Sequence, residues 1–440
     1  QRQPHHVSGT ALLSHHERQK VTAFTAQTTC RICGASLENV LELGDIYPSR
    51  FLAEDENGTT RVPLTLARCT NPDCTLVQLR HTVAPDEMYR KYFYRSALNQ
   101  AMVSALKDVV DEAQKCVQLQ FGDAVCDIAC NDGTLLGFYT PEYFRVGFDP
   151  AENLGVQPDN LDYFINDYFS ADQYPLHWNK AKIITSIAMF YDLPDPVAFT
   201  RQVKSILHED GVWIIQLSDL VSMLDQNAFD GICHEHLEYY SAWDIISLMR
   251  REGLSVFRIT QNRVNGGSLR FFISHEGKRE VEKSVSDCLM EESIFLGSED
   301  GSMEAFARRI RQIGYTVVNF LIDAKYRNQR VYALAASTKG NTLLQYYGIT
   351  ADMIQKVGDV NPDKYGKITI GSNIEIVPEE QALQEKPEYL LLLAWHYIDT
   401  ICLKLLPYLR EGGKIVVPLP EPRIYYHANG AVRSTALENA

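Results

Sequence analysis

The pattern of apolar and polar positions predicts alternating helices and strands from residue 98 onward. Residues 98–117 place apolar side chains at helical spacing. Thr134 is expected to open a helix just after the first of four short apolar runs, which predict strands at 124–129, 145–148, 183–186 and 212–216. Because strands alternate with helices, we predict an α/β fold with a doubly wound parallel sheet and a ligand at the carboxyl ends of its strands.

The C-terminal part repeats this alternation. Residues 280–327 predict two helices separated by the Gly/Ser break GSEDGS, the second running from Met303 to about Tyr326. A strand at 330–334 leads to Ser337-Thr338-Lys339-Gly340-Asn341 and a helix, and strands at 389–393 and 414–417 complete a second Rossmann-like α/β sheet. Hydroxyls, an amide and a lysine at a helix N-terminus suit an anion, although a helix cap beside a surface lysine would give the same pattern.

The composition is that of an ordinary globular protein and narrows the set of partners. The 440 residues are enough for two to three domains, with 45% hydrophobic and 22% charged residues. The net charge of -14 argues against nucleic acid or an anionic membrane as the main partner, while a locally basic pocket would still admit a phosphorylated substrate. No apolar run approaches the roughly 20 residues that cross a bilayer, and the N-terminal residues lack an apolar signal core, so we expect a cytoplasmic protein.

Four of the ten cysteines form two closely spaced pairs near the N-terminus: Cys30, Cys33, Cys69 and Cys74. The first pair flanks a tight turn that Gly34 can close, and the second flanks a segment that contains Asn-Pro-Asp. Four thiolates suit a tetrahedral structural zinc ion with no open position for catalysis, whereas four unrelated cysteines would rarely fall in this pattern. The other six cysteines lie mostly in apolar patterns, which fits buried thiols in a reducing compartment.

A cofactor loop follows the first strand of the central region. The loop Cys130-Asn131-Asp132-Gly133 is not a GxGxxG sequence, which disfavours NAD, and an acid ends the next strand at the interval expected of a carboxylate that holds ribose hydroxyls. This arrangement predicts S-adenosylmethionine, although helix capping alone would explain Asp132 or Asp167. The candidate cofactor-binding residues are Asp127, Cys130, Asn131, Asp132, Gly133, Asp149, Pro150, Asp167 and Ser186.

Nine segments together resemble the sugar C-methyltransferases that act on nucleotide-linked 4-keto-deoxy sugars. In chain order they are CRICG, RCTNPDCTLVQL, KYFYRS, DIACNDGTLL, FDGICHEHLEYYS, VNGGSLR, ASTKGNTLLQYYGI, NPDKYGKITIG and LLAWHY. The resemblance implies an S-adenosylmethionine-dependent enzyme that makes a branched deoxy sugar. It implies four parts: a flexible leader (1–25), a zinc-binding module (26–80), a cofactor-binding methyltransferase domain (81–275) and a C-terminal Rossmann-like substrate-binding domain (276–440).

The resemblance also implies a set of site residues. The family's Tyr-Asp-Glu-His motif falls on Cys233-His234-Glu235-His236, where the glutamate and the last histidine match and the first two residues differ. The family's base therefore corresponds to His236, with Glu235 beside it. The implied catalytic set is His236, Glu235, His234, Tyr92, Tyr94 and Asp192, and the implied substrate-binding set is Asn265, Lys339 and Asn341. The family's Gly-Tyr-Gly-Ala turn reads Ala333-Leu334-Ala335-Ala336 here.

The expected chemistry explains why such residues are needed. A carbon beside a ketone must lose a proton before it can take a methyl group, so the site requires a base and a donor that stabilises the enolate oxygen. A histidine suits the base, and the hydroxyl of Tyr92 or Tyr94 could donate to the enolate. The open alternatives are a polar surface loop at His234–His236, an O- or N-methyltransferase, and a non-catalytic protein that binds zinc and a nucleotide. The expected assembly is a monomer or a weak homodimer.

Overall fold

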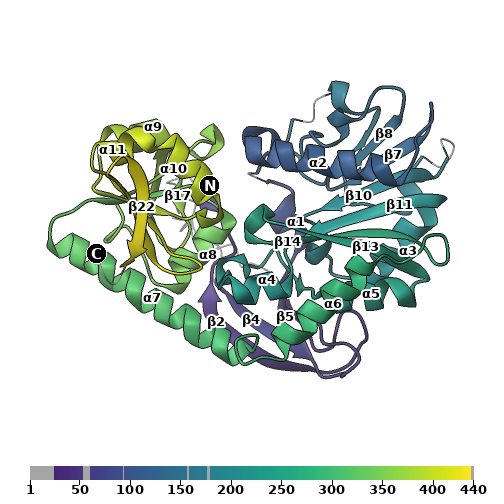
Figure 1. The fold of residues 1–440 in the computed structure, drawn as a ribbon, viewed down its shortest axis with the longest axis horizontal. Helices are drawn as coiled ribbons and strands as arrows, with labels where there is room; N and C mark the ends of the chain where they lie inside the picture. The colour runs from purple at the N-terminus through teal and green to yellow at the C-terminus, as the bar shows by residue number, and fades with distance from the viewer. Residues whose placement is uncertain (1–23, 53–59, 93, 156–157, 176–178, 438–440) are drawn as a thin grey trace, which may run out of the picture.

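The computed structural model describes residues 24–52, 60–92, 94–155, 158–175 and 179–437, and it forms two α/β lobes with a β-rich module between them (Figure 1). Residues 1–23, most of the predicted leader, lie outside the described residues, as do the paired histidines at 5–6 and 15–16. Phe24 and Thr25 already belong to the folded part, because strand β1 (Phe24–Ala26) pairs antiparallel with β6 (His81–Val83).

The central lobe contains the predicted doubly wound sheet. Its seven strands run in the order β13-β14-β11-β10-β7-β8-β9, with β7 to β11 parallel and β14 antiparallel to both of its neighbours. The chain steps outward from β7 to β9 and then returns to the other side of β7, so the strand order reverses between β7 and β10. The strands are β7 (Ala124–Ile128), β8 (Phe144–Phe148), β9 (Tyr163–Ile165), β10 (Ala181–Ile187), β11 (Leu207–Leu217), β13 (Leu254–Asn262) and β14 (Ser268–His275).

Helices cover both faces of this sheet because successive strand residues point to opposite sides. Val125, Ile183 and Val212 pack against α2 (Gln100–Cys116), whereas Cys126, Ile184 and Trp213 pack in a second core with α3 (Pro196–Ile206), α5 (Ala242–Arg251) and α6 (Lys283–Leu296). The Asn99 side chain caps α2 and Ser241 forms a capping box on α5.

The expected helix after Thr134 does not form. The chain makes only the 3₁₀ turn η2 (Leu136–Phe138) before it enters β8. Gly137 lowers helix propensity, and Pro141 disfavours helical backbone at Thr140, so the segment stops after one turn. The cofactor loop is consequently followed by a compact turn that brings Leu135 and Leu136 into the core.

The sheet of the β-rich module includes one strand from the central part of the sequence. Its sheet has the order β12-β5-β4-β2 and is antiparallel throughout. Three strands come from the N-terminal segment, β2 (Leu37–Ile46), β4 (Val62–Cys69) and β5 (Val77–Leu79), but β12 (Glu238–Tyr239) follows directly after the predicted catalytic segment. The module is therefore joined to that segment by backbone hydrogen bonds.

The C-terminal lobe forms a second α/β sheet of nine strands, as the sequence predicts for its parallel centre. The order is β22 (Ala431–Ala436), β21 (Arg423–Ala428), β20 (Lys414–Val417), β19 (Tyr389–Leu392), β15 (Val331–Leu334), β16 (Lys356–Asp359), β18 (Glu375–Pro378), β17 (Ile368–Thr369) and β3 (Phe51–Leu52). The last strand comes from the N-terminal segment and pairs with β17, so that segment contacts both lobes.

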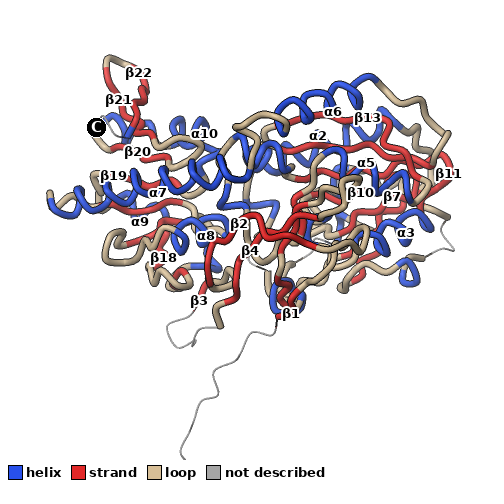
Figure 2. The backbone as a smooth tube through the Cα atoms, turned by 90° about the horizontal axis from the view of Figure 1, so that it is seen from below, coloured by secondary structure: helices blue, strands red, loops and turns tan. Residues whose placement is uncertain are grey.

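The remaining helices connect and cover the lobes. The long helix α7 (Met303–Tyr326) runs along the C-terminal lobe toward the central one, and the strands of the module lie between the two (Figure 2). The others are α1 (Pro85–Tyr89), α4 (Leu220–Asp225), α8 (Thr338–Tyr346), α9 (Glu379–Gln384), α10 (Ile398–Lys404) and α11 (Leu406–Arg410). Among the described helices, none is both long enough and apolar enough to span a bilayer.

Candidate active site and zinc centre

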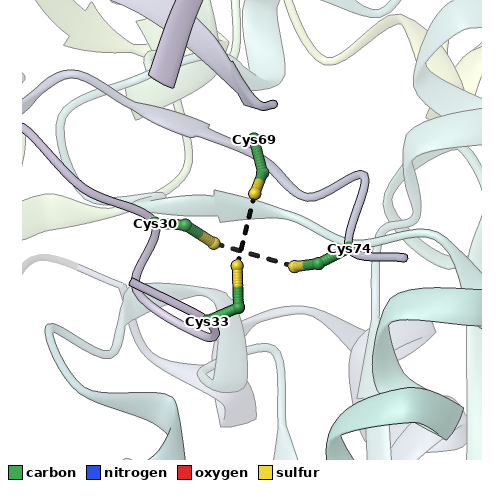
Figure 3. Close-up of side chains that lie close together, drawn as sticks. All are labelled: Cys30, Cys33, Cys69 and Cys74. Atoms are coloured by element: carbon green, nitrogen blue, oxygen red, sulfur yellow. Dashed lines mark hydrogen bonds between the residues drawn. The ribbon is translucent and has the colours of Figure 1, made fainter. Parts of the chain in front are cut away.

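The four predicted metal ligands converge on one point (Figure 3). Their sulfur atoms all lie within 4.8 Å of one another, with Cys30 Sγ 3.7 Å from Cys74 Sγ and Cys33 Sγ 3.4 Å from Cys69 Sγ. A tetrahedral zinc ion with Zn–S bonds of about 2.3 Å would hold its sulfurs about 3.8 Å apart, so the observed cluster fits zinc with a small expansion. The four thiolates fill the coordination shell, and the zinc is structural.

An ion pair and two hydrogen bonds connect the zinc module to the segment that contains the predicted base. Arg31, which lies between the first two ligands, forms a fully buried ion pair with Glu238 on β12 (Nε to Oε1, 3.4 Å). The Leu79 amide donates to the Leu237 carbonyl at 2.8 Å, and His234 Nε2 lies 3.1 Å from the Val62 carbonyl oxygen. Three contacts from different parts of the module therefore position residues 234–238.

The cofactor loop leaves β7 with two non-glycine residues in the left-handed region, Ala129 at φ 62° and Asn131 at φ 53°. The Asp149 carboxylate holds this shape, because its Oδ2 accepts the Asn131 amide at 2.8 Å and its Oδ1 accepts the Ala151 amide at 2.9 Å. A carboxylate has four lone pairs, so two acceptor positions stay available for ribose hydroxyls. This donor set at the end of β8 fits the ribose of S-adenosylmethionine.

The other predicted cofactor residues divide into two groups. Asp132 lies at the loop and accepts the Ala97 amide at 2.8 Å, and Asp167, which follows β9, pairs with Arg90 at 3.1 Å. The side chains of Asp127, Cys130 and Ser186 are buried within the domain.

These three buried side chains make contacts inside the domain. Asp127 accepts the Thr185 hydroxyl at 2.6 Å, and burial raises its pKa to about 7. The Ser186 hydroxyl accepts Trp213 Nε1 at 3.1 Å. Cys130 fills the space beside Gly147, where a Cβ atom would come within 2.8 Å of its sulfur. Gly133 (φ 79°) and Pro150 complete the two turns.

His236 lies in a small cavity of about 30 Å³ at the carboxyl end of the central sheet. Its Nδ1 is 2.8 Å from the Gly231 carbonyl oxygen, so Nδ1 carries the proton that it donates and Nε2 is the basic nitrogen. Its ring packs on Tyr191, with ring centroids 4.2 Å apart. Burial, the nearby charge of Lys339 and the Gly231 contact together set the pKa of His236 to about 4, so the imidazole is neutral at pH 7.

Glu235 and Asp192 form a buried acidic pair next to this cavity. Burial raises the pKa of Glu235 to about 7. Burial also raises the pKa of Asp192 well above its usual value, and the carboxylates of Glu235 and Glu238 raise it further. Glu235 Oε2 and Asp192 Oδ1 have no hydrogen-bond partner among the described residues. Buried polar atoms are normally paired, so both atoms are available to a ligand.

The two predicted tyrosines occupy different places. Burial raises the pKa of Tyr92, and the charges of Asp192 and Glu235 raise it further, which places its hydroxyl in their field. Tyr94 is 41% exposed, and its hydroxyl lies toward Tyr397 and Asp132. Neither tyrosine is among the described residues that line the His236 cavity.

The C-terminal lobe contributes the opposite wall through the start of α8. Lys339 lines the cavity, and its Nζ donates to the Asn265 carbonyl at 2.8 Å; Asn265 itself lines the cavity at φ 56°. The Thr338 hydroxyl is 3.4 Å from Glu235 Oε1. Asn341 points elsewhere, because its Nδ2 donates to Ser49 Oγ at 2.8 Å and ties α8 to the segment before β3.

Several residues of the site are missing from the predicted set. Tyr191 supports the His236 ring, and the Tyr89 hydroxyl donates to the Glu235 carbonyl at 2.8 Å. Trp395 donates to Asp230 at 2.9 Å and packs over Gly266, while burial and Lys339 lower the pKa of His396. The aromatic runs MYRKYFY and LLAWHY contain three of these residues, so aromatic density was the available signal.

Family models and one relative agree with these parts of the chain. Family models match a zinc binding domain at residues 30–89, a methyltransferase domain at 91–259 and a C-methyltransferase C-terminal domain at 263–420. The C-methyltransferase NovU of Streptomyces niveus is 31% identical over 405 residues, which is 90% of this chain and 96% of NovU. A solved S-adenosylmethionine-dependent methyltransferase from Clostridium acetobutylicum is 15% identical and covers 40% of this chain and 92% of its own, with a TM-score of 0.32.

Proposed function

The chain belongs to the zinc-binding C-methyltransferase family, and from this premise we propose that it methylates a carbon beside the ketone of a nucleotide-linked 4-keto-deoxy sugar, producing a branched deoxy sugar in the cytoplasm. That the chain is an S-adenosylmethionine-dependent methyltransferase follows from its methyltransferase domain and its relationship to NovU. The sugar, the position of methylation and the residue roles are the proposed part.

The observation that carries the proposal is the state of His236. A neutral imidazole with Nδ1 turned to a carbonyl presents an unprotonated Nε2 inside a small cavity. Such a group is placed to accept the proton from a carbon acid. When S-adenosylmethionine is bound, it supplies a sulfonium methyl group as electrophile; Asp149 and the loop that it fixes would hold its ribose.

Glu235 and Asp192 would act on the substrate's hydroxyls and on the charge of the site. Because burial raises the pKa of both carboxyls, each is able to carry a proton near neutral pH and to donate as well as accept. Their unpartnered oxygens provide the positions at which a sugar hydroxyl would bind. Tyr92 lies in the same field and would take part in this polar network.

The described conformation is a closed one. A cavity of about 30 Å³ has room for little more than a single water molecule, whereas small-ligand pockets measure about 300–1,000 Å³. We infer that the C-terminal lobe moves away from the central lobe to admit the nucleotide sugar. The contacts that break are Lys339 with Asn265 and Trp395 with Asp230, both between the lobes.

The test combines a substrate screen with an exchange assay. Nucleotide-linked 4-keto sugars are incubated with methyl-labelled S-adenosylmethionine, and products are identified by mass spectrometry and NMR. With the active sugar, wild-type protein should exchange the proton beside the ketone with deuterated water even without cofactor. An O- or N-methyltransferase makes no enolate and would show no such exchange.

The His236→Ala variant then tests the base. We expect both exchange and methyl transfer to fall by about 10²–10⁴-fold with cofactor affinity unchanged. His208→Ala is the matched control, because His208 lies near the opposite end of β11. Retained exchange in His236→Ala would refute the assignment of the base.

A further inference from the structure

We propose that Lys339 is a catalytic residue whose ammonium group stabilises the enolate oxygen, so that the C-terminal lobe supplies the oxyanion-binding group of the reaction. This inference rests on the proposed function. It gives Lys339 a different task from the phosphate-type anion site that the sequence around it predicts.

Lys339 and His236 line the same cavity, Lys339 from α8 and His236 from the segment before β12. The charge of Lys339 contributes to lowering the pKa of His236 after burial, which places the ammonium within electrostatic range of the base. A ketone held in this cavity would have its α-carbon toward His236 and its oxygen near a cation.

Lys339 is the only lysine or arginine among the described residues that line the cavity, and its Nζ donates to a neutral carbonyl. It makes no ion pair among the described residues, and its charge acts on the buried Asp230, whose raised pKa it partly lowers. Two carboxyls also line the cavity: Glu238, which pairs with Arg31, and Asp219, whose Oδ1 accepts the Ser222 amide at 2.9 Å. Burial raises the pKa of both, which reduces the negative charge they place beside Lys339.

Lys339 is the second residue of α8, where the helix dipole is positive and disfavours a cation. The dipole and the ammonium add their positive potentials at the cavity, which opposes helix stability and favours an anion. Ser337 already caps the helix, its hydroxyl accepting the Gly340 amide at 3.0 Å, so capping does not explain the lysine.

The other polar residues of the predicted anion site have partners of their own. Asn341 donates to Ser49, and the Thr338 hydroxyl donates to Glu235. With Ser337 capping the helix, the side chains around Lys339 do not gather as a phosphate cradle. Tyr94, a predicted enolate donor, is not among the described residues that line the cavity.

Proton transfer from the α-carbon and methylation of that carbon conserve atoms and electrons. His236 Nε2 takes the proton from the α-carbon, the C–H electron pair forms the carbon–carbon double bond, and the carbonyl π pair moves to oxygen beside Lys339 Nζ. A bound S-adenosylmethionine, with its ribose held at Asp149, would supply the methyl group: the carbon–carbon π pair would form the bond to the methyl carbon, an oxygen lone pair would re-form the carbonyl, and the sulfur would keep the pair of the broken C–S bond. Lys339 gains and loses no proton.

The experiment compares Lys339→Met, Lys339→Arg and the control Lys325→Met, an exposed lysine on α7. The readouts are kcat and KM for cofactor-independent deuterium exchange on the active 4-keto sugar, together with calorimetric binding of the corresponding nucleoside diphosphate. Removing one preorganised oxyanion group lowers kcat by about 10²–10³-fold. We expect that loss in Lys339→Met, at least tenfold recovery in Lys339→Arg, and diphosphate affinity within threefold of wild type.

The opposite pattern would overturn the proposal. If Lys339→Met weakens diphosphate binding more than tenfold while kcat for exchange stays near wild type, Lys339 holds the diphosphate. If Lys339→Met leaves all three quantities unchanged, it has neither role. A wild-type protein that shows neither exchange nor methyl transfer on any nucleotide 4-keto sugar would instead refute the proposed function, so the two failures are distinguishable. Circular dichroism of each variant confirms folding.

Discussion

The zinc cluster and the cavity around His236 are both groups of buried ionisable side chains, but they differ in which polar atoms they leave without a partner. In the cluster, four sulfurs point to one centre and the metal uses all of them. Beside the cavity, Glu235 Oε2 and Asp192 Oδ1 point to no partner among the described residues. This difference separates a structural site from a candidate ligand site. The zinc ligands are all satisfied and stabilise the fold, whereas buried polar atoms without a partner are available to bind a ligand.

The two sites are also physically connected, through Arg31 and Glu238 and through the pairing of β12 with β5. The zinc module therefore acts on the catalytic segment directly, in addition to stabilising its own fold. The following predictions test how far this connection extends, from the largest expected effect to the smallest.

Cys69→Ser should have the largest effect. Structural zinc contributes apparent folding free energy of about 10–16 kcal/mol, so losing it should unfold the module and remove the strand partner of β12. We expect loss of zinc by mass spectrometry, rapid proteolysis within residues 26–83, and methyl transfer lowered about 100-fold or more. Cys288→Ser, at a half-buried thiol on α6, is the control. Wild-type activity in a zinc-free protein would break the connection between the sites.

Arg31→Met should follow, because it leaves the buried Glu238 carboxyl without its ion-pair partner. Breaking such a pair destabilises a protein by about 3–5 kcal/mol, measurable as a shift in urea-induced unfolding. The double variant Arg31→Met/Glu238→Gln removes the unpaired carboxyl and should recover at least half of the loss. Arg201→Met, which breaks an exposed pair with Glu252, should change stability by about 1 kcal/mol or less.

Glu235→Gln should reveal the raised pKa of the catalytic segment through a pH dependence of stability. Burial raises the pKa of Glu235 from an ordinary 4.5 to about 7, so the folded wild type binds this proton more tightly than the unfolded chain does. The resulting stabilisation is fully present below pH 4.5 and is lost as the pH rises through 7. The stability of the variant relative to wild type should therefore increase across that window, by about 3 kcal/mol in total. A constant difference in free energy of unfolding between pH 4 and pH 8 would contradict the raised pKa.

His234→Gln should have the smallest effect and separates the two histidines of the His-Glu-His segment. His234 is bonded to the Val62 carbonyl in the zinc module, away from the cavity that contains His236. Losing one buried hydrogen bond should destabilise the protein by about 1 kcal/mol, and kcat should stay within about tenfold of wild type. A loss as large as that of His236→Ala would show that His234 takes part in catalysis.

Local sequence was enough to predict the cluster of four cysteines, the loop that follows β7 and the two sheets. The two cysteine pairs are set by short turns, and Asp149 ends the strand next to the loop that it supports. These features depend on residues that are near one another in sequence or at the ends of neighbouring strands. The helix expected after Thr134 was wrong because the propensity of a few residues did not outweigh Gly137 and Pro141.

Only the tertiary structure decided which side chains meet around His236. Its cavity combines Tyr191 after β10, the Asn265 turn before β14 and Lys339 from the second lobe, and the adjoining wall is fixed by Arg31 of the zinc module. No periodicity connects positions that are hundreds of residues apart, because their contact results from the packing of separate folding units. The sequence by itself determined the chemical groups available to this protein, and the packing of lobes and module determined that His236 and Lys339 line one cavity.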